Sequence, residues 1–229
     1  MKLASSLVIA LGIMFGGYFI GNGVIQFKKL DRLVEVKGLA EKIVESDEAR
    51  WMLNYNLSSN DMADLNKKIM QTNDEITKFL LAQGFDINEI EKMAGNITDK
   101  EALEYSDRKG LRYVVRGGFV ISSKKVSKLI EASQRSDELL SRGVVLSGSQ
   151  ISYYFTKLNE IKPAMLEEAI KNAKEAANSF AKTADASLGD IKYASQGLFS
   201  ISSPISEYES ESSFRKRIRV VSQVSFYLK

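Results

Sequence analysis

Hydrophobic residues recur with two different periods between residues 33 and 228, and these periods constrain the fold more than any other feature. Strand-like stretches carry an apolar residue at every second position, whereas helix-like stretches carry one every three or four positions. The strand-like stretches are 33–36, 43–57, 111–121, 144–158, 191–201 and 214–228, and the helix-like stretches are 58–84, 126–140 and 160–184. This order predicts an α+β fold in which three main helices pack on one face of a largely antiparallel sheet.

Local signals add detail to this pattern. Gly38 is expected to end the first strand, and the segment 85–97 mixes both periods. Paired glycines, Gly117 and Gly118, interrupt an otherwise apolar strand and indicate a bulge or a sharp twist. The helix at 160–184 has an apolar stripe made mostly of alanine, which predicts unusually close packing against a sheet.

The N-terminal segment carries no charged side chain from Leu3 to Phe27. Residues 7–27 are nearly all apolar, and a helix of that length would span about 31 Å, which matches the hydrocarbon core of a bilayer. A secretory signal peptide usually has a shorter apolar region followed by a small-x-small cleavage site. We therefore expect an N-terminal transmembrane anchor at 1–29, with its N-terminus inside, and one domain at 30–229. Cleavage of the segment as a signal peptide is the alternative.

Four glycines inside this segment are spaced for helix association. Gly12 and Gly16, and likewise Gly17 and Gly21, lie four positions apart and place small residues on one helix face. This spacing lets two helix backbones approach closely within a membrane. The alternative is that glycine is simply common in membrane helices and in signal sequences.

Histidine and cysteine are both absent from the 229 residues. Their absence excludes disulfides, thiolate nucleophiles, zinc-finger sites and Ser-His-Asp triads. The formal net charge is only +3, from 32 Lys and Arg against 29 Asp and Glu, so we expect no nucleic-acid partner. The composition argues against an enzyme, and we expect neither a metal nor a cofactor.

Two groups of polar residues could be interpreted as catalytic sites, but each has a simpler structural explanation. Glu167 and Glu168 lie near Lys171 on the third helix, where Glu-to-Lys pairs four residues apart are typical of a solvated face. Residues 122–125, with the sequence Ser-Ser-Lys-Lys, could form a Ser-Lys dyad, although their order first indicates a helix N-cap.

The sharpest charge feature is the basic run at 215–219, in which three arginines alternate and would share one face of a strand. They could bind an envelope ligand, such as a glycan or a lipid, together with nearby tyrosines. They could instead form the solubilising outer face of an edge strand. The residues of this candidate surface are Arg215, Arg217, Arg219, Tyr113, Tyr153 and Tyr154.

Several short motifs occur in an order and spacing that resemble the SIMPL-domain family, bacterial exported proteins that include the Brucella periplasmic immunogenic protein. The motifs are Val36-Lys37-Gly38, Arg116-Gly117-Gly118-Phe119, Glu168-Ala169-Ile170-x-x-Ala173, Leu188-Gly189-Asp190 and the closing run 218–226. The resemblance covers about residues 30–229. It implies a secreted, periplasmic or membrane-anchored protein, associated with envelope integrity and oxidative-stress defence, for which no catalytic residue or cofactor is agreed.

We therefore expect a non-enzymatic, single-pass inner-membrane protein whose C-terminal domain lies in the periplasm and associates with copies of itself through sheet edges or helix faces. The alternative is a periplasmic binding module for a glycan, lipid or protein ligand that uses the arginine and tyrosine surface. An enzyme ranks third, and a pocket containing a partly buried lysine or carboxylate with no salt-bridge partner would revive it.

Overall fold

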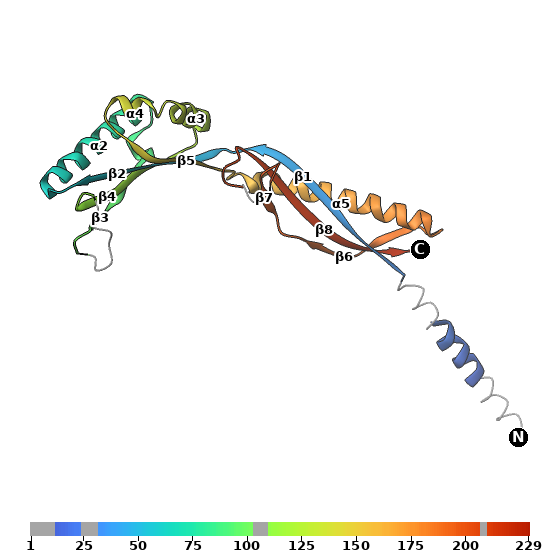
Figure 1. The fold of residues 1–229 in the computed structure, drawn as a ribbon. Helices are drawn as coiled ribbons and strands as arrows, with labels where there is room; N and C mark the ends of the chain where they lie inside the picture. The colour runs from blue at the N-terminus through green and yellow to red at the C-terminus, as the bar shows by residue number, and fades with distance from the viewer. Residues whose placement is uncertain (1–11, 24–31, 103–109, 207–209) are drawn as a thin grey trace, which may run out of the picture. The chain divides into compact units, whose positions relative to one another are not determined.

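A computed structural model of the chain describes residues 12–23, 32–102, 110–206 and 210–229 (Figure 1). Its strands are β1 (Leu33–Glu45), β2 (Glu48–Ser59), β3 (Ile90–Asp99), β4 (Tyr113–Ser123), β5 (Leu146–Tyr154), β6 (Leu188–Gln196), β7 (Ser200–Ser202) and β8 (Arg215–Leu228). Its helices are α2 (Met62–Ala82), α3 (Val126–Gln134), α4 (Glu138–Ser141) and α5 (Leu158–Thr183), with a short 3-10 helix, η1, at Ile87–Glu89. Residues 12–23 are also helical.

The chain divides into two compact units. The first comprises Met1–Lys42, Asn159–Ser200 and Ile218–Lys229, and the second comprises Ile43–Leu158 and Ile201–Arg217. One sheet has the order β1-β8-β6, with β7 paired to β8, and the other has the order β3-β4-β2-β5. The prediction of a single sheet that carries all three main helices is therefore wrong. Hydrophobic periodicity shows which residues of a strand are buried, but it does not show which strands pair.

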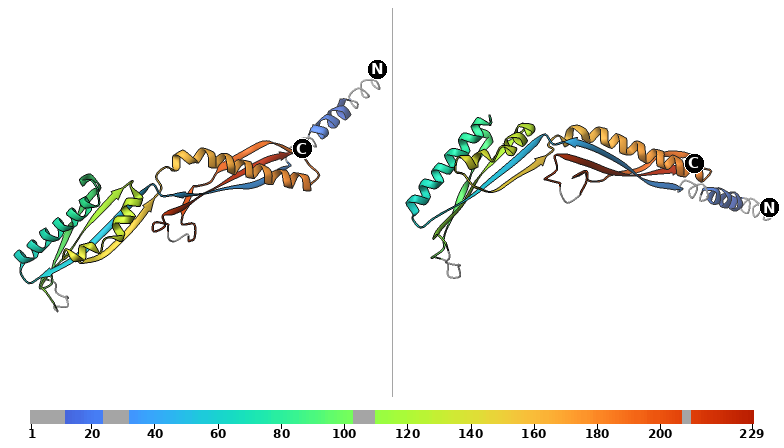
Figure 2. Two further views of the ribbon diagram at one scale, coloured as in Figure 1. Left: turned by 90° about the horizontal axis from the view of Figure 1, so that it is seen from above. Right: turned by 45° about the horizontal axis from the view of Figure 1, so that its top comes forward.

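In the second unit, α2 and α3 pack against the sheet around β2 (Figures 1 and 2). Trp51, Leu53 and Tyr55 of β2 point into this core and are almost inaccessible to solvent, as their alternation predicts. The ring of Trp51 meets Phe79 of α2 edge-on, with ring centroids 6.5 Å apart. The strand pairs β2–β4, β2–β5 and β3–β4 are antiparallel.

The ends of the helices in this unit follow from local sequence. The Asp61 carboxylate accepts hydrogen bonds from the backbone N–H groups of Ala63 and Asp64, at 2.6 and 3.1 Å, and so caps the first turn of α2. The single helix predicted at 126–140 is instead two helices, α3 and α4. The mixed segment 85–97 contains η1 followed by β3.

In the first unit, α5 packs along the sheet formed with β1 and β8 (Figure 2). The stripe that faces the sheet is mostly alanine, and Ala169, Ala173 and Ala177 are completely buried, which confirms the predicted close approach. A Cβ atom built on Gly38 would lie 1.8 Å from the carbonyl oxygen of Ala169. The strand end predicted at Gly38 is wrong, because this glycine makes room for the helix while β1 continues to Glu45.

The expected N-terminal anchor also needs correction. No helix among residues 12–23, 32–102, 110–206 and 210–229 is both long and apolar enough to cross a membrane. The predicted transmembrane helix and the single-pass inner-membrane localisation are therefore wrong. Of the segment predicted as an anchor, residues 1–11 and 24–29 lie outside the described residues.

Gly12, Gly16, Gly17 and Gly21 lie on the helical stretch at 12–23. A Cβ atom built on any of them meets nothing within 4 Å in the described part of the chain. Their packing against a second helix therefore stays a prediction, as does the domain boundary between residues 29 and 30.

Replacement of Gly38 by alanine should destabilise the first unit strongly. The added methyl group would overlap the Ala169 carbonyl and the Ala173 backbone nitrogen, which lies 2.6 Å from the ideal Cβ position, so α5 must move away from β1. Overpacking of this kind costs about 3 kcal/mol. Urea unfolding of Gly38→Ala should show this loss in the free energy of unfolding. Lys37→Ala, at the exposed neighbouring position, should change it little, and an equal loss in both variants would contradict the packing explanation.

Candidate functional site

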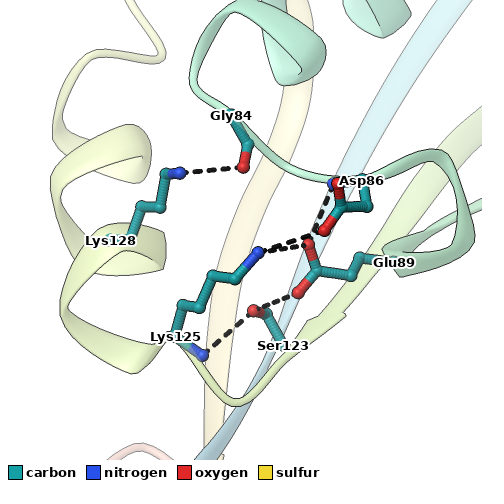
Figure 3. A network of polar contacts seen from close by, with 6 residues as sticks. All are labelled: Gly84, Asp86, Glu89, Ser123, Lys125 and Lys128. Carbon is teal, nitrogen blue, oxygen red and sulfur yellow. Dashed lines mark hydrogen bonds and ion pairs between the residues drawn. The ribbon is translucent and has the colours of Figure 1, made fainter.

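The Ser-Lys pair suggested by residues 122–125 belongs to a network of polar contacts (Figure 3). The Ser123 hydroxyl donates a hydrogen bond to Glu89 Oε1 at 2.6 Å and accepts one from the backbone N–H of Lys125 at 3.0 Å. The Lys125 ammonium lies 3.1 Å from Asp86 Oδ2 and 3.4 Å from Glu89 Oε2. Lys128 donates to the Gly84 carbonyl at 2.8 Å.

Electrostatics in this network oppose catalysis by a Ser-Lys dyad. Hydrogen bonds to Asp86 and Glu89 raise the pKa of Lys125, whereas a lysine base must lose its proton readily. Burial raises the pKa of Glu89, but hydrogen bonds from Ser123, from the Asp86 backbone and from Lys125 outweigh burial and leave this pKa below its ordinary value. The network therefore holds the segment that contains η1 against the start of α3, which is a structural role.

Two of the three arginines in the predicted ligand surface are engaged within the chain. Arg217 donates a hydrogen bond to the Pro204 carbonyl, and Arg219 Nε lies 3.5 Å from Glu41 Oε1. Within the described residues, the Arg215 side chain is exposed and makes no hydrogen bond or ion pair. Arg215 and Arg217 belong to the second unit and Arg219 to the first. A ligand role for these arginines stays a prediction.

The tyrosines of the predicted surface are not brought together. Tyr153 packs edge-on against Phe214, with ring centroids 5.8 Å apart, and burial raises the pKa of its hydroxyl. Tyr154 is 37% exposed and points to the other face of β5. Tyr113 pairs with Ser59 of β2, whereas Tyr153 pairs with Ala49. Ten residues of strand, about 33 Å, separate those two positions.

A buried lysine at position 216 bears on the possibility of an enzyme, although burial alone does not place it in a pocket. Lys216 of β8 is 2% exposed, and burial lowers the pKa of its ammonium while the charge of Glu211 opposes this shift. The ammonium donates a hydrogen bond to the Ser210 carbonyl. A lysine bound to a backbone carbonyl in this way ties the chain segment before β8 to the strand, so we assign it a structural role.

A polar hollow lies on the face of the second unit's sheet that points away from α2 and α3. Its volume is about 460 Å³, within the range of small-ligand sites. The residues that line it are Asn54, Tyr55, Asn56, Met93, Ala94, Asn96, Arg116, Gly117 and Ser147. They come from β2, β3, β4 and β5, so every strand of this sheet contributes.

Irregular strand pairing and glycines create this hollow. The register shifts between Asn54 and Tyr55 in the β2–β5 pair, and again between Met93 and Asn96 in the β3–β4 pair. Such bulges bend a strand and redirect its side chains. On this face, Asn54 is paired with a glycine in each neighbouring strand, Gly118 in β4 and Gly148 in β5. Of the glycine pair predicted to mark a bulge or a sharp twist, Gly118 lies beside Asn54 on this face. Gly117 pairs with Tyr55 and faces its ring on the other side of the sheet.

The polar side chains in the hollow are not engaged with other described residues of the chain. Within the described residues, the side chains of Asn54, Asn56, Asn96, Arg116 and Ser147 make no hydrogen bond or ion pair. None of the lining residues is a carboxylate, so Arg116 supplies the only formal charge. Sequence reasoning did not identify this cluster. Alternation along β2 placed the two asparagines of that strand on the open face, but the other members become neighbours only through strand pairing.

A second exposed feature is the edge strand β6 in the first unit. Its residues from Asp190 to Gln196 are all exposed, including Ile191 at 51% and Tyr193 at 59%. β6 pairs with β8 on one side, and among the described residues no strand pairs with its other side. Exposed apolar side chains on a free edge are unusual, because such edges readily pair with other chains.

These features define an α+β protein with two sheets, each packed against helix on one face. A family profile described as "SIMPL: Protein of unknown function (DUF541)" matches residues 34–224, which is most of the chain. The chain belongs to the SIMPL family, as the sequence resemblance indicated. The description of the family assigns no activity, so membership alone assigns none to this chain.

Other comparisons add little. No curated protein matches this sequence. A solved structure titled "Crystal structure of a hydrolase from Listeria innocua" covers 83% of this chain and 92% of its own, at 10% sequence identity and a TM-score of 0.25. A superposition this loose supports no conclusion about the fold or the activity of the chain.

Glu89→Gln should lower the free energy of unfolding at neutral pH. It should also make the free energy of unfolding depend less steeply on pH in the acid range. The folded-state pKa of Glu89 lies below its ordinary value of 4.5, so its carboxylate stabilises the fold above that pH. This contribution disappears as the pH falls through the folded-state pKa. Loss of a charge-assisted hydrogen bond costs about 1.5 kcal/mol. The measurement is urea unfolding at several pH values from about 7 down to about 3.

Glu91→Gln is the matched control, because Glu91 is an exposed carboxylate of β3 close to Glu89 in the sequence. Its acid sensitivity should equal that of the unmodified protein. If Glu89→Gln also unfolds with unmodified acid sensitivity, the network of Figure 3 does not stabilise the fold through its charge.

Proposed function

We propose that this SIMPL-family chain is a non-enzymatic domain of periplasmic type that associates with copies of itself through the edge strand β6. The observation that carries the proposal is the exposure of Ile191 and Tyr193 on a strand with a free edge. The unpaired N–H and C=O groups of such an edge can form a ladder with a second strand, and its apolar side chains would then leave water.

Lys192, the lysine of β6, does not block pairing of the free edge with another strand. Charged side chains on an edge strand normally prevent pairing with another chain. Lys192 instead lies over the ring of Tyr227 on the neighbouring strand β8, with its ammonium 5.6 Å from the ring centroid. This contact directs the Lys192 ammonium toward β8, which is the paired side of β6.

The exposed face of α5 is a poorer candidate for self-association. Glu167, Glu168 and Lys171 are all exposed on it, in keeping with the predicted solvated face. Ile170 and Phe180 are also exposed on α5, at 40% and 62%, but the charged side chains of this helix would lose hydration on association. Of the two routes expected from the sequence, sheet edges and helix faces, the edge therefore has the stronger support.

The wider role implied by the resemblance, in envelope integrity and oxidative-stress defence, stays a prediction. The alternative binding surface, made of Arg215, Arg217, Arg219, Tyr153 and Tyr154, has less support than the edge strand. Its arginines are partly engaged within the chain, and one of its tyrosines packs against Phe214.

Replacement of both Ile191 and Tyr193 by lysine should convert the protein to monomers. Two added charges on the edge would repel a second copy and remove the apolar contact. We expect the unmodified full-length chain to form dimers or larger assemblies in mass photometry and in light scattering at tens of micromolar, and the double variant to show the monomer mass.

Ile170→Lys is the control, because Ile170 is an exposed isoleucine on α5 in the same unit and is 40% accessible. This variant should assemble as the unmodified chain does. A monomeric unmodified chain at every concentration, or equal dissociation of the control variant, would overturn the proposal.

A further inference from the structure

We propose that the polar hollow on the open face of the β3-β4-β2-β5 sheet binds a sugar that carries a carboxylate. The proposal concerns the second unit only and does not depend on self-association through β6. It rests on the size of the hollow, on its single charge and on a set of side-chain amides that make no hydrogen bond among the described residues.

The single charge in the hollow points to an anionic ligand. Arg116 is exposed, and its guanidinium makes no hydrogen bond or ion pair within the described residues. A guanidinium presents paired N–H donors whose geometry matches the two oxygens of a carboxylate. Because none of the lining residues is acidic, no group in the hollow competes with the ligand for this cation.

The three asparagine side chains and the serine indicate that the same ligand also carries hydroxyl groups. The amides of Asn54, Asn56 and Asn96 each offer donors and an acceptor, and Ser147 offers a hydroxyl. Adjacent hydroxyls of a sugar ring both donate and accept, so they can pair with such amides. A simple carboxylate would satisfy the arginine alone and leave these amides unpaired.

The glycines that flank Asn54 in β4 and β5 make room for its side-chain amide. A Cβ atom built on Gly118 would lie 2.9 Å from Asn54 Oδ1, and one built on Gly148 would lie 3.4 Å from Asn54 Nδ2. The amide therefore extends across the sheet, with its oxygen toward β4 and its nitrogen toward β5. Because the neighbouring residues on both strands are glycines, no side chain covers the amide from either side. A ligand ring that lies over the sheet can therefore contact it.

The hollow is also large enough for this class of ligand. Its volume of about 460 Å³ falls within the roughly 300–1,000 Å³ of typical ligand pockets. Met93 lines the side formed by β3 and adds an apolar contact for the carbon skeleton of the sugar.

The test is a titration of the full-length, isotope-labelled protein with three probes: D-glucuronate, D-glucose and acetate. We expect glucuronate to shift the side-chain amide resonances of Asn54, Asn56 and Asn96, and to bind at least about tenfold more tightly than either other probe. Arg116→Gln should weaken glucuronate binding about tenfold and abolish the preference over glucose. Asn96→Ala should weaken both sugars.

Arg50→Gln is the matched control for charge. Arg50 is an exposed arginine on the same face of β2, outside the hollow, and its loss should leave glucuronate binding unchanged. Thermal melting of each variant confirms that it is folded before the titration.

Four results would overturn the proposal. If acetate binds as tightly as glucuronate, the hollow is a site for plain carboxylates, such as those of acidic peptides. If glucose binds as tightly as glucuronate, Arg116 does not select an anion. If no probe shifts the asparagine resonances, or if Arg50→Gln weakens binding as much as Arg116→Gln does, the hollow is not the site.

Discussion

Burial of one sheet face, with the other left open, is the constraint on which the rest of this structure depends. The second unit packs α2 and α3 against one face of its sheet, and the first unit packs α5 against its own sheet. A strand covered on one side alternates buried and exposed residues, and the exposed set is free to vary without loss of the core. The polar hollow lies on the open face of one sheet, and the exposed strand β6 lies at the edge of the other.

Close packing in the first unit depends on small residues on both sides of the contact. Gly38 admits the backbone of α5 at a distance that no side chain would permit, and Ala169 and Ala173 meet it from the helix. The same small residues limit the apolar area that each position can bury. Stability therefore depends on intimate contact along the whole helix rather than on a few large side chains.

The chemistry of the polar groups is decided by their partners and not by their types. Ser123 and Lys125 are the residue types of a catalytic dyad, yet two carboxylates hold the lysine in its charged form. Lys216 is buried, as many reactive lysines are, yet its ammonium donates a hydrogen bond to a backbone carbonyl. Nothing in the sequence distinguishes Arg116 from other arginines. It becomes a candidate for binding because, among the described residues, neither its guanidinium nor the neighbouring asparagine amides have a hydrogen-bond partner.

The sequence by itself determined the buried faces of elements such as β2 and α5, because periods of 2 and 3.6 follow from local backbone geometry. It therefore predicted the core positions Trp51, Leu53 and Tyr55, the alanine stripe of α5 and the family. Only the tertiary structure decided that the strands form two sheets, that Gly38 serves packing and that β6 is a free edge. It also decided that Asn54, on β2, shares a hollow with residues of three other strands. These outcomes depend on pairing between segments far apart in the chain, for which local periodicity carries no information.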